Sequence, residues 1–293
     1  MSTPPPRVLL TGGSGLLGRQ VLSVFRAACV PITGLCYSRP GSDLVQLDIT
    51  NLAATRDLIK DLQPTVVIHA AAQRFPDKVE GDLEAAVRLN VEATKNLAEV
   101  CVETKCRMIY ISTDYVFDGE HPPFFPDNKP RPLNKYGETK LAGEEVVLTT
   151  NPDFLVLRIP VLYGGVNTLS ESAVTILLDV IRSGKKAKMS SYEVRCPSHT
   201  QDIARILLDI VRKTPPGGIY QWCGLEKLSK WDMCKMISKE TGLDISHLEE
   251  VVGAGGTPRP RDVELDREKL RQLGIEHHTV LKEGIMEDLK QFL

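Results

Sequence analysis

A glycine-rich turn near the N-terminus constrains the fold of this chain more than any other segment. Residues 11–18 read T-G-G-S-G-L-L-G, directly after an apolar run and directly before a helical pattern. The spacing of Gly12, Gly15 and Gly18 allows a tight turn, a close approach of the backbone to a pyrophosphate and close packing of the helix. Free N–H groups of the first helical turn would face the anion. We therefore predict a dinucleotide-binding strand–turn–helix unit, with a plain glycine-rich turn as the alternative.

Short apolar runs alternate with longer helical patterns through the first half of the chain. Runs that are apolar on both faces indicate a parallel sheet covered by helices on two sides, and right-handed crossovers then require a doubly wound fold. We predict an α/β Rossmann core over residues 1–165, to which a segment near 198–222 returns, and a smaller substrate-side lobe formed mainly by residues 166–293. The expected strands are residues 8–10, 32–36, 65–69, 108–112 and 154–159, and the expected helices are residues 16–28, 52–62, 83–101 and 133–148.

Composition excludes several classes of protein. Of the 293 residues, 42% are hydrophobic and 25% charged, which excludes a disordered or fibrous chain. The net charge of -2 provides no long-range field for nucleic acid or an anionic membrane. Seven cysteines without a C-x-x-C pair predict reduced thiols, and the six histidines show no metal-ligand spacing, so we expect no metal. No apolar stretch is long enough for a signal peptide or a membrane span, so we expect a cytoplasmic protein.

The end of the second expected strand indicates which dinucleotide the site prefers. An NAD site usually has an acidic residue about 20 residues past the turn, for the ribose 2′-hydroxyl. This chain has Tyr37, Ser38 and Arg39 there. A guanidinium suits a 2′-phosphate, so we predict NADP rather than NAD. The alternative is a surface arginine on a loop.

A tyrosine and a lysine four residues apart form a second motif. Tyr136 and Lys140 lie on one face of the expected helix, so the ammonium would lower the pKa of the phenol toward neutral and could hold a ribose hydroxyl. The phenol could then donate a proton to a carbonyl as hydride arrives. Thr113, at the end of the fourth strand, could hydrogen-bond the same carbonyl oxygen. The alternative is an exposed helical pair.

With these motifs, the chain resembles the extended short-chain dehydrogenase/reductase family. Residues 111–119 (I-S-T-D-Y-V-F-D-G) resemble the signature of its dTDP-4-dehydrorhamnose reductase branch. Within that branch, the chain is similar to regulatory β subunits of methionine adenosyltransferase. The similar stretches are residues 69–74, 157–164, 171–175 and 259–266.

The resemblance implies roles for individual residues. Thr113, Tyr136 and Lys140 would form a reductase triad, and Asn90 would help to order it. Arg259 and Arg261 would contact a substrate diphosphate, unless they belong to a solvated turn. Arg158 would be an ion-pair partner, and Asp48 has helix capping as its alternative role. The implied residues of the NADP(H) site are Gly12, Ser14, Gly15, Leu16, Leu17, Gly18, Tyr37, Ser38, Arg39, Asp48, Ile49, Ala70, Arg74, Tyr136, Lys140 and Leu162.

Two functions from different classes follow from the resemblance. The favoured one is a regulatory subunit that binds NADP(H), docks on the catalytic subunit of methionine adenosyltransferase and modulates S-adenosylmethionine synthesis. The other is an NADPH-dependent reductase of a nucleotide-linked 4-keto-6-deoxy sugar, with Tyr136 as the proton donor. The β subunits are expected to continue past their last helix with a basic, aromatic tail that reaches the partner, and the sequence given ends at residues 288–293 without one.

Overall fold

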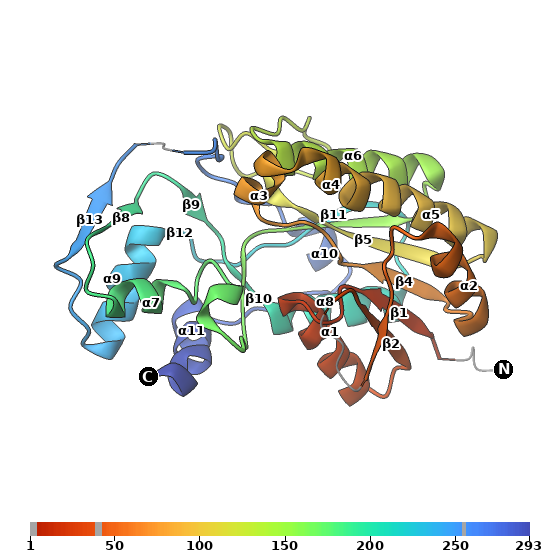
Figure 1. Ribbon diagram of the computed structural model, residues 1–293, viewed down its shortest axis with the longest axis horizontal. Coiled ribbons are helices and arrows are strands. Elements are labelled where there is room, and N and C mark those ends of the chain that lie inside the picture. The colour runs from red at the N-terminus through yellow and green to blue at the C-terminus, as the bar shows by residue number, and fades with distance from the viewer. Residues whose placement is uncertain (1–4, 39–42, 254–255) are drawn as a thin grey trace.

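Seven parallel strands form the central sheet of the computed structural model, which describes residues 5–38, 43–253 and 256–293 (Figure 1). The chain builds the sheet outward in two directions from a switch point between β1 and β4, so the predicted doubly wound α/β fold is confirmed. In spatial order the strands are β11 (Gly218–Gln221), β6 (Leu155–Ile159), β5 (Arg107–Thr113), β4 (Val66–His69), β1 (Val8–Thr11), β2 (Ile32–Cys36) and β3 (Leu44–Gln46).

The strands form because their residues are apolar on both faces. Alternate residues of each strand enter two separate cores: in β1, Val8 and Leu10 face one helix layer and Leu9 faces the other. Each fully buried aliphatic side chain contributes about 1.5–3 kcal/mol to folding. One core is covered by α1 (Leu16–Ala27) and α8 (Thr200–Lys213), and the other by α2 (Leu52–Leu62), α5 (Ala93–Glu103) and α6 (Lys135–Thr150).

The helix expected over residues 83–101 is interrupted. The structure has α4 (Leu83–Val87), a π-helical turn over Arg88–Glu92 and then α5. A short helix that the sequence pattern did not predict, α3 (Pro76–Gly81), precedes them. The interruption turns Asn90 into the protein, where it is 1% exposed. This correction matters for the site, because π-turns place side chains that a regular helix would point elsewhere.

A smaller lobe lies beside the sheet, at the left of Figure 1. It has its own apolar core, which includes Leu178, Ile181, Ile237 and Ile285. The chain leaves the sheet after β6 and returns to it through α8 and β11, while the boundary at residue 165 stays a prediction. The remaining elements are β7 (Leu162–Tyr163), α7 (Leu177–Arg182), β8 (Ala187–Ser190), β9 (Val194–Arg195), β10 (Ser198–His199), β12 (Leu228–Ser229), α9 (Lys230–Thr241), β13 (Leu248–Val251), α10 (Glu268–Arg271) and α11 (Leu281–Leu289).

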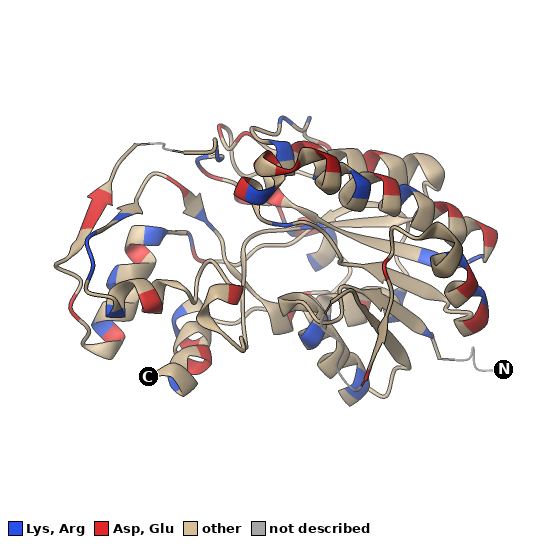
Figure 2. Ribbon diagram, viewed as in Figure 1, with Lys and Arg blue, Asp and Glu red and all other residues tan. Residues whose placement is uncertain are grey.

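Acidic and basic residues are interspersed over the outer helices (Figure 2). This mixture matches the near balance of 36 Lys and Arg against 38 Asp and Glu. No helix among the described residues combines the length and the apolar character that crossing a membrane requires.

Candidate functional site

A cavity of about 980 Å³ is lined both by residues from the sheet's carboxyl ends and by residues of the smaller lobe. Such crevices at the switch point of a doubly wound sheet are the usual ligand sites of the fold. The described residues predicted for the cofactor and the triad all line this cavity. The structure therefore brings them together, while their roles toward a cofactor stay predictions.

The glycine-rich turn shapes one end of the cavity. Gly12 has a φ of +75°, and a Cβ there would lie 3.0 Å from the backbone of Ala70. A Cβ on Gly18 would lie 2.1 Å from the Gly12 carbonyl oxygen, so α1 packs directly on the turn. Gly15 is the N-cap residue of α1, and its N–H donates to the Gly12 carbonyl at 2.9 Å. The unpaired N–H groups of the first turn of α1 suit a pyrophosphate.

The end of the cavity where adenosine is expected follows β2 and β3. Tyr37, which is 69% exposed, and Ser38 line it, whereas Arg39 lies outside the described residues. Asp48 also lines the cavity, and its carboxylate accepts hydrogen bonds from the Thr50 N–H and hydroxyl at 2.9 and 2.7 Å. Asn51, rather than Asp48, caps α2, so the capping alternative for Asp48 is wrong.

The three residues of the predicted triad line the cavity from β5 and α6. Asn134 caps α6 through the Gly137 N–H and so fixes the start of the helix that carries two of them. The Lys140 ammonium donates to the Ile111 carbonyl at 2.7 Å and lies 4.0 Å from the centroid of the Tyr110 ring. Lys140 is 3% exposed, which excludes the alternative of an exposed helical pair.

Burial dominates the ionisation of this site. It raises the pKa of the Tyr136 phenol far above its ordinary value, against an opposing contribution from Thr113. It lowers the pKa of Lys140 to about 7, although the Glu144 carboxylate opposes the fall. The structure therefore does not bring the phenol toward neutral as expected from Lys140, because desolvation outweighs the contributions of Thr113 and Arg74 that lower its pKa.

A buried carboxylate adjoins the triad. Burial raises the pKa of Asp114 to about 6, while Arg195 and Thr113 oppose the rise. The Thr113 hydroxyl donates to the Asp114 carboxylate at 3.0 Å and accepts from the Tyr115 N–H at 3.2 Å. A hydroxyl has one proton to donate. In this arrangement the Thr113 hydroxyl would have to turn from Asp114 before it could donate to an incoming carbonyl.

Buried polar contacts hold the frame around the triad. The Asn90 side chain accepts a hydrogen bond from the Gln73 N–H and donates one to the Gln73 carbonyl. It also donates to the Thr139 hydroxyl at 3.1 Å, so it joins the loop after β4 to α6. Arg158 makes a bidentate ion pair with Glu144, with a shortest distance of 2.7 Å. Asn90 and Arg158 are not among the residues that line the cavity. Both contact α6, which carries two residues of the predicted triad, while their roles stay predictions.

Arg259, which was expected at a substrate diphosphate, lines the lobe side of the cavity. Arg195, Lys230 and Glu193 line it too, and the sequence pattern did not reveal these three charges. Arg259 also pairs with the Asp77 carboxylate at 3.3 Å. These cations come from three distant segments, so no sequence spacing could have predicted their convergence. They suit an anionic group such as a phosphate.

Arg261, the other arginine expected at a diphosphate, lies elsewhere. Its guanidinium lies 5.6 Å from the centroid of the Tyr192 ring, and neither residue lines the cavity. No group of three or more His, Cys, Asp or Glu side chains in the described part of the chain could hold a metal ion.

Comparisons with known proteins agree with this geometry. The family model described as RmlD substrate binding domain matches residues 6–293. The chain is 43% identical to methionine adenosyltransferase 2 subunit beta of Xenopus tropicalis, over 100% of this chain and 90% of that protein. It is 29% identical to dTDP-4-keto-6-deoxy-D-glucose reductase of Streptomyces niveus, over 92% and 91% of the two chains.

The fold is shared with solved structures. The dTDP-4-dehydrorhamnose reductase of Bacillus anthracis, solved in complex with NADP, superposes with a TM-score of 0.85 at 22% identity, over 99% of this chain and 100% of that one. The match to nearly the whole chain and the identity to its relatives show that the protein belongs to the RmlD substrate binding domain family, within the extended short-chain dehydrogenases/reductases, as the sequence resemblance predicted.

Proposed function

We propose that this chain is an NADP(H)-binding regulatory subunit of methionine adenosyltransferase, which modulates S-adenosylmethionine synthesis by docking on the catalytic subunit. The observation that carries the proposal is the 43% identity to a subunit of that name over the whole chain, against 29% to a reductase. A cytoplasmic location accords with this proposal, since all seven cysteines are free thiols.

The cavity lining offers groups that suit each part of a dinucleotide. The N–H groups at the start of α1, with Ser14 beside them, would hold the pyrophosphate. Tyr136 and Lys140 would hold the nicotinamide ribose, with Leu162 at the nicotinamide edge. Tyr37, Ser38 and Arg39 would surround the adenosine 2′-phosphate. When bound, NADPH would supply hydride chemistry, which a regulatory role does not require.

The state of the triad supports cofactor holding over turnover. A general acid works best when its pKa lies near the working pH. Burial raises the pKa of Tyr136, which takes it further above that pH. The Thr113 hydroxyl donates to Asp114 in this structure, so it must rotate before it can polarise a carbonyl. The same side chains can still accept or donate hydrogen bonds to a ribose. Motif residues can thus be kept for binding alone.

Two measurements test the proposal. Titration of the intact chain should give tighter binding of NADPH than of NADH, by at least about tenfold if a guanidinium meets the 2′-phosphate. Size-exclusion chromatography with the catalytic subunit should give one complex in the presence of NADP, and the complex should alter the rate of S-adenosylmethionine formation. Separate elution at micromolar concentrations of both proteins would contradict the regulatory role.

A second candidate is a reductase of a nucleotide-linked 4-keto-6-deoxy sugar. The observation that favours it is that Thr113, Tyr136 and Lys140 share one cavity with three cations able to meet a diphosphate. NADPH absorbance should then fall when dTDP-4-dehydrorhamnose is added. Tyr136→Phe should abolish that loss and leave NADPH binding within about threefold, because only the phenol proton is removed.

The control for Tyr136→Phe is Tyr192→Phe, since Tyr192 does not line the cavity. That variant should keep the wild-type rate. A wild-type protein that leaves NADPH unchanged over a panel of nucleotide sugars, both alone and with the catalytic subunit, would exclude the reductase and leave the regulatory proposal.

A further inference from the structure

A segment of the smaller lobe lines the cavity and contacts α1 close to the glycine-rich turn. We call residues 165–176, which join β7 to α7, the strap. Its inner side lines the cavity through Ser170, Ser172, Val174 and Ile176. The strap contains one 3-10 turn, Leu169–Glu171. The dinucleotide site therefore has a wall that belongs to the smaller lobe rather than to the sheet.

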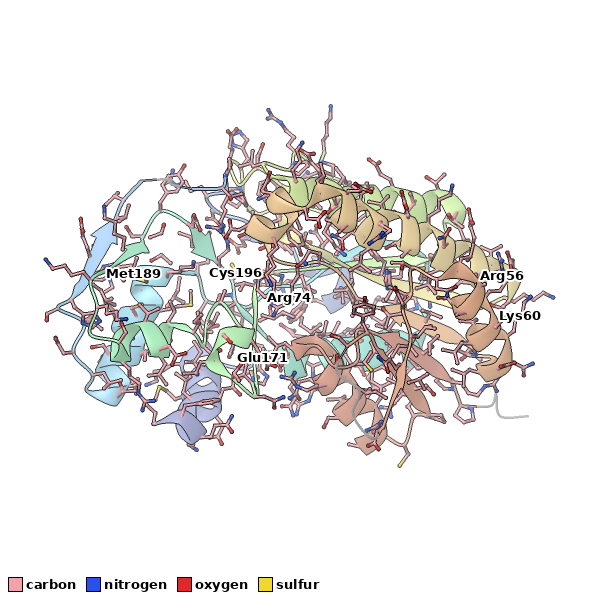
Figure 3. All side chains as sticks on the ribbon, in the orientation of Figure 1. Arg56, Lys60, Arg74, Glu171, Met189 and Cys196 are labelled. Carbon is pink, nitrogen blue, oxygen red and sulfur yellow. The ribbon has the colours of Figure 1, made fainter. Side chains whose placement is uncertain are left out.

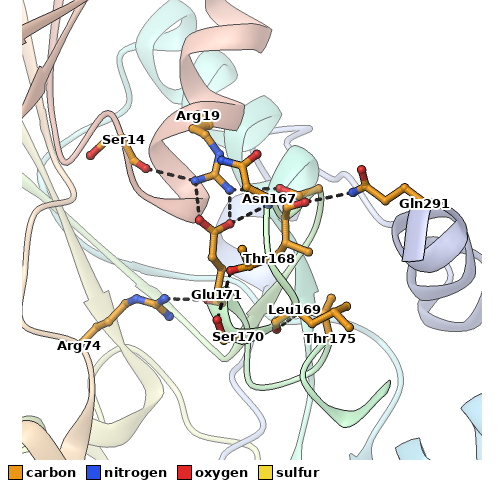
Figure 4. Close-up of polar contacts among 12 residues, drawn as sticks. Ser14, Arg19, Arg74, Asn167, Thr168, Leu169, Ser170, Glu171, Thr175 and Gln291 are labelled. Carbon is orange, nitrogen blue, oxygen red and sulfur yellow. Dashed lines mark hydrogen bonds and ion pairs between the residues drawn. The ribbon is translucent and has the colours of Figure 1, made fainter. Parts of the chain in front are cut away.

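One ion pair fastens the strap to the turn (Figure 4). The Arg19 guanidinium, in the first turns of α1, binds both carboxylate oxygens of Glu171, at 2.5 and 3.2 Å. The same guanidinium donates to the Ser14 carbonyl at 3.1 Å and to the Gly165 carbonyl at 3.4 Å. Arg19 and Glu171 side chains are 25% and 15% exposed, so solvent screens the pair only in part. Arg19 thus joins the predicted pyrophosphate turn to the strap.

A second arginine reaches the strap from the opposite side of the cavity. Arg74 donates to the Glu171 carbonyl at 2.7 Å and lies 4.4 Å from the centroid of the Phe75 ring. Arg74 and Phe75 both line the cavity. Figure 3 shows Arg74 and Glu171 between the sheet and the smaller lobe. Glu171 is therefore held through its carboxylate by α1 and through its carbonyl by the loop after β4.

Further bonds hold the strap to β7, to the C-terminal segment and to itself. The Ser172 hydroxyl donates to the Leu162 carbonyl at 2.7 Å, and the Gln291 amide donates to the Val166 carbonyl at 3.0 Å. The Asn167 N–H donates to the Glu171 carboxylate at 3.0 Å. Among the strap contacts described here, those to Arg19 and Arg74 reach α1 and the loop after β4 of the nucleotide-binding core.

We infer that the Arg19–Glu171 pair is a latch that closes the strap over the dinucleotide, so that cofactor release requires this pair to open. The inference rests on the NADP(H) binding proposed above. Lids of this kind control exchange by gating, and their loss raises dissociation rates. Glu171 also adds a negative charge near a site for an anion, which gives an opposing electrostatic effect that the test must separate.

The two effects of Glu171 predict opposite changes in the release of NADPH. If the carboxylate acted through charge alone, Glu171→Gln would slow dissociation, because one repulsive charge is gone. If it is a latch, Glu171→Gln should accelerate dissociation about tenfold, the equivalent of about 1.4 kcal/mol. Glu171→Asp keeps the charge but shortens the side chain by one methylene, so the latch predicts faster release here too, whereas charge alone predicts no change.

Stopped-flow displacement of NADPH fluorescence by excess NADP measures these rates on the intact chain. The matched control is Glu103→Gln, which removes another bidentate arginine–glutamate pair, Arg56–Glu103, with both distances 3.0 Å. Neither of its residues lines the cavity, and Figure 3 shows Arg56 at the end of the molecule away from the smaller lobe. Glu103→Gln should release NADPH at the wild-type rate. Unchanged or slower release from both Glu171 variants overturns the latch.

Hydrogen exchange tests the latch without any cofactor. In the unliganded protein, Glu171→Gln should speed exchange of the strap amides, such as those of Asn167 and Ile176, at least about tenfold, while α5 amides keep their wild-type rates. Unchanged strap exchange overturns the latch. A wild-type chain that binds no NADPH overturns the proposed function instead, and the exchange data then decide the latch alone. Circular dichroism of each variant confirms folding before either comparison.

Discussion

Replacing Gly18 with alanine tests whether the packing of α1 on the glycine-rich turn builds the cofactor site. The new Cβ would lie 2.1 Å from the Gly12 carbonyl oxygen and 2.8 Å from the Gly13 Cα. Ordinary close carbon–oxygen contacts are about 3.3 Å or longer, so helix and turn must separate by about 1 Å. The obstructing atoms are backbone, so no side-chain rotation relieves the clash.

The expected loss of stability follows from two opposing contributions. Overpacking costs about 1–3 kcal/mol, and a contact this short belongs at the upper end. Alanine is more favourable than glycine in a helix, which stabilises the folded state by about 1 kcal/mol. We expect Gly18→Ala to lower the free energy of unfolding by about 2 kcal/mol, which corresponds to a Tm about 3 °C lower for a chain of this length. A displacement of about 1 Å should also weaken NADPH binding at least about tenfold.

Thermal unfolding followed by circular dichroism, and NADPH titration, measure the two effects. The control is Gly81→Ala, at the end of α3, where an added Cβ meets nothing within 4 Å. That variant should bind NADPH normally and gain up to about 1 kcal/mol. If Gly18→Ala matches Gly81→Ala in both Tm and affinity, the close approach of helix and turn is not what the site requires.

Two further predictions concern buried charges. Arg158→Met should lower the free energy of unfolding by about 3–5 kcal/mol, because it leaves the Glu144 carboxylate buried without its arginine partner. The double variant Arg158→Met with Glu144→Leu should lose less of this free energy, and urea denaturation of both variants measures the difference. Lys140 has a folded-state pKa of about 7, below its ordinary 10.5, so the native state binds fewer protons and wild type gains stability as pH rises from 7 toward 10. The Tm of unliganded Lys140→Met minus the Tm of wild type should therefore become lower as the pH is raised from 6 to 9. A Tm difference that does not change with pH would contradict this prediction.

The sheet was predictable because its strands carry the signal in their own residues. The expected boundaries of residues 32–36 and of the helix over residues 52–62 match β2 and α2. Local apolar runs suffice when both faces of a strand are buried, since no choice of face is needed. The turn at Gly12 was predictable for a similar reason, because three glycines at fixed spacing have few alternatives.

Other features depend on tertiary contacts that no local pattern encodes. The apolar spacing of residues 83–101 continues through the π-turn, so the pattern does not mark where Asn90 turns inward. The four-residue spacing of Tyr136 and Lys140 placed both on one helix face, but it could not give the depth of burial that sets their pKa values. Arg195 and Lys230 meet across segments with no shared motif. The shared location of such residues can be recognised only in the folded structure.

The late position of β11 in the sequence has a consequence for biosynthesis. β11 pairs with β6, yet residues 160–217 must leave the ribosome between the two strands. Until then β6 is an edge strand of the nascent sheet, and its unpaired backbone N–H and C=O groups can pair with other chains. A ribosome that stalls before residue 221 would release a product prone to aggregate, and chaperone capture should concentrate in that interval of translation.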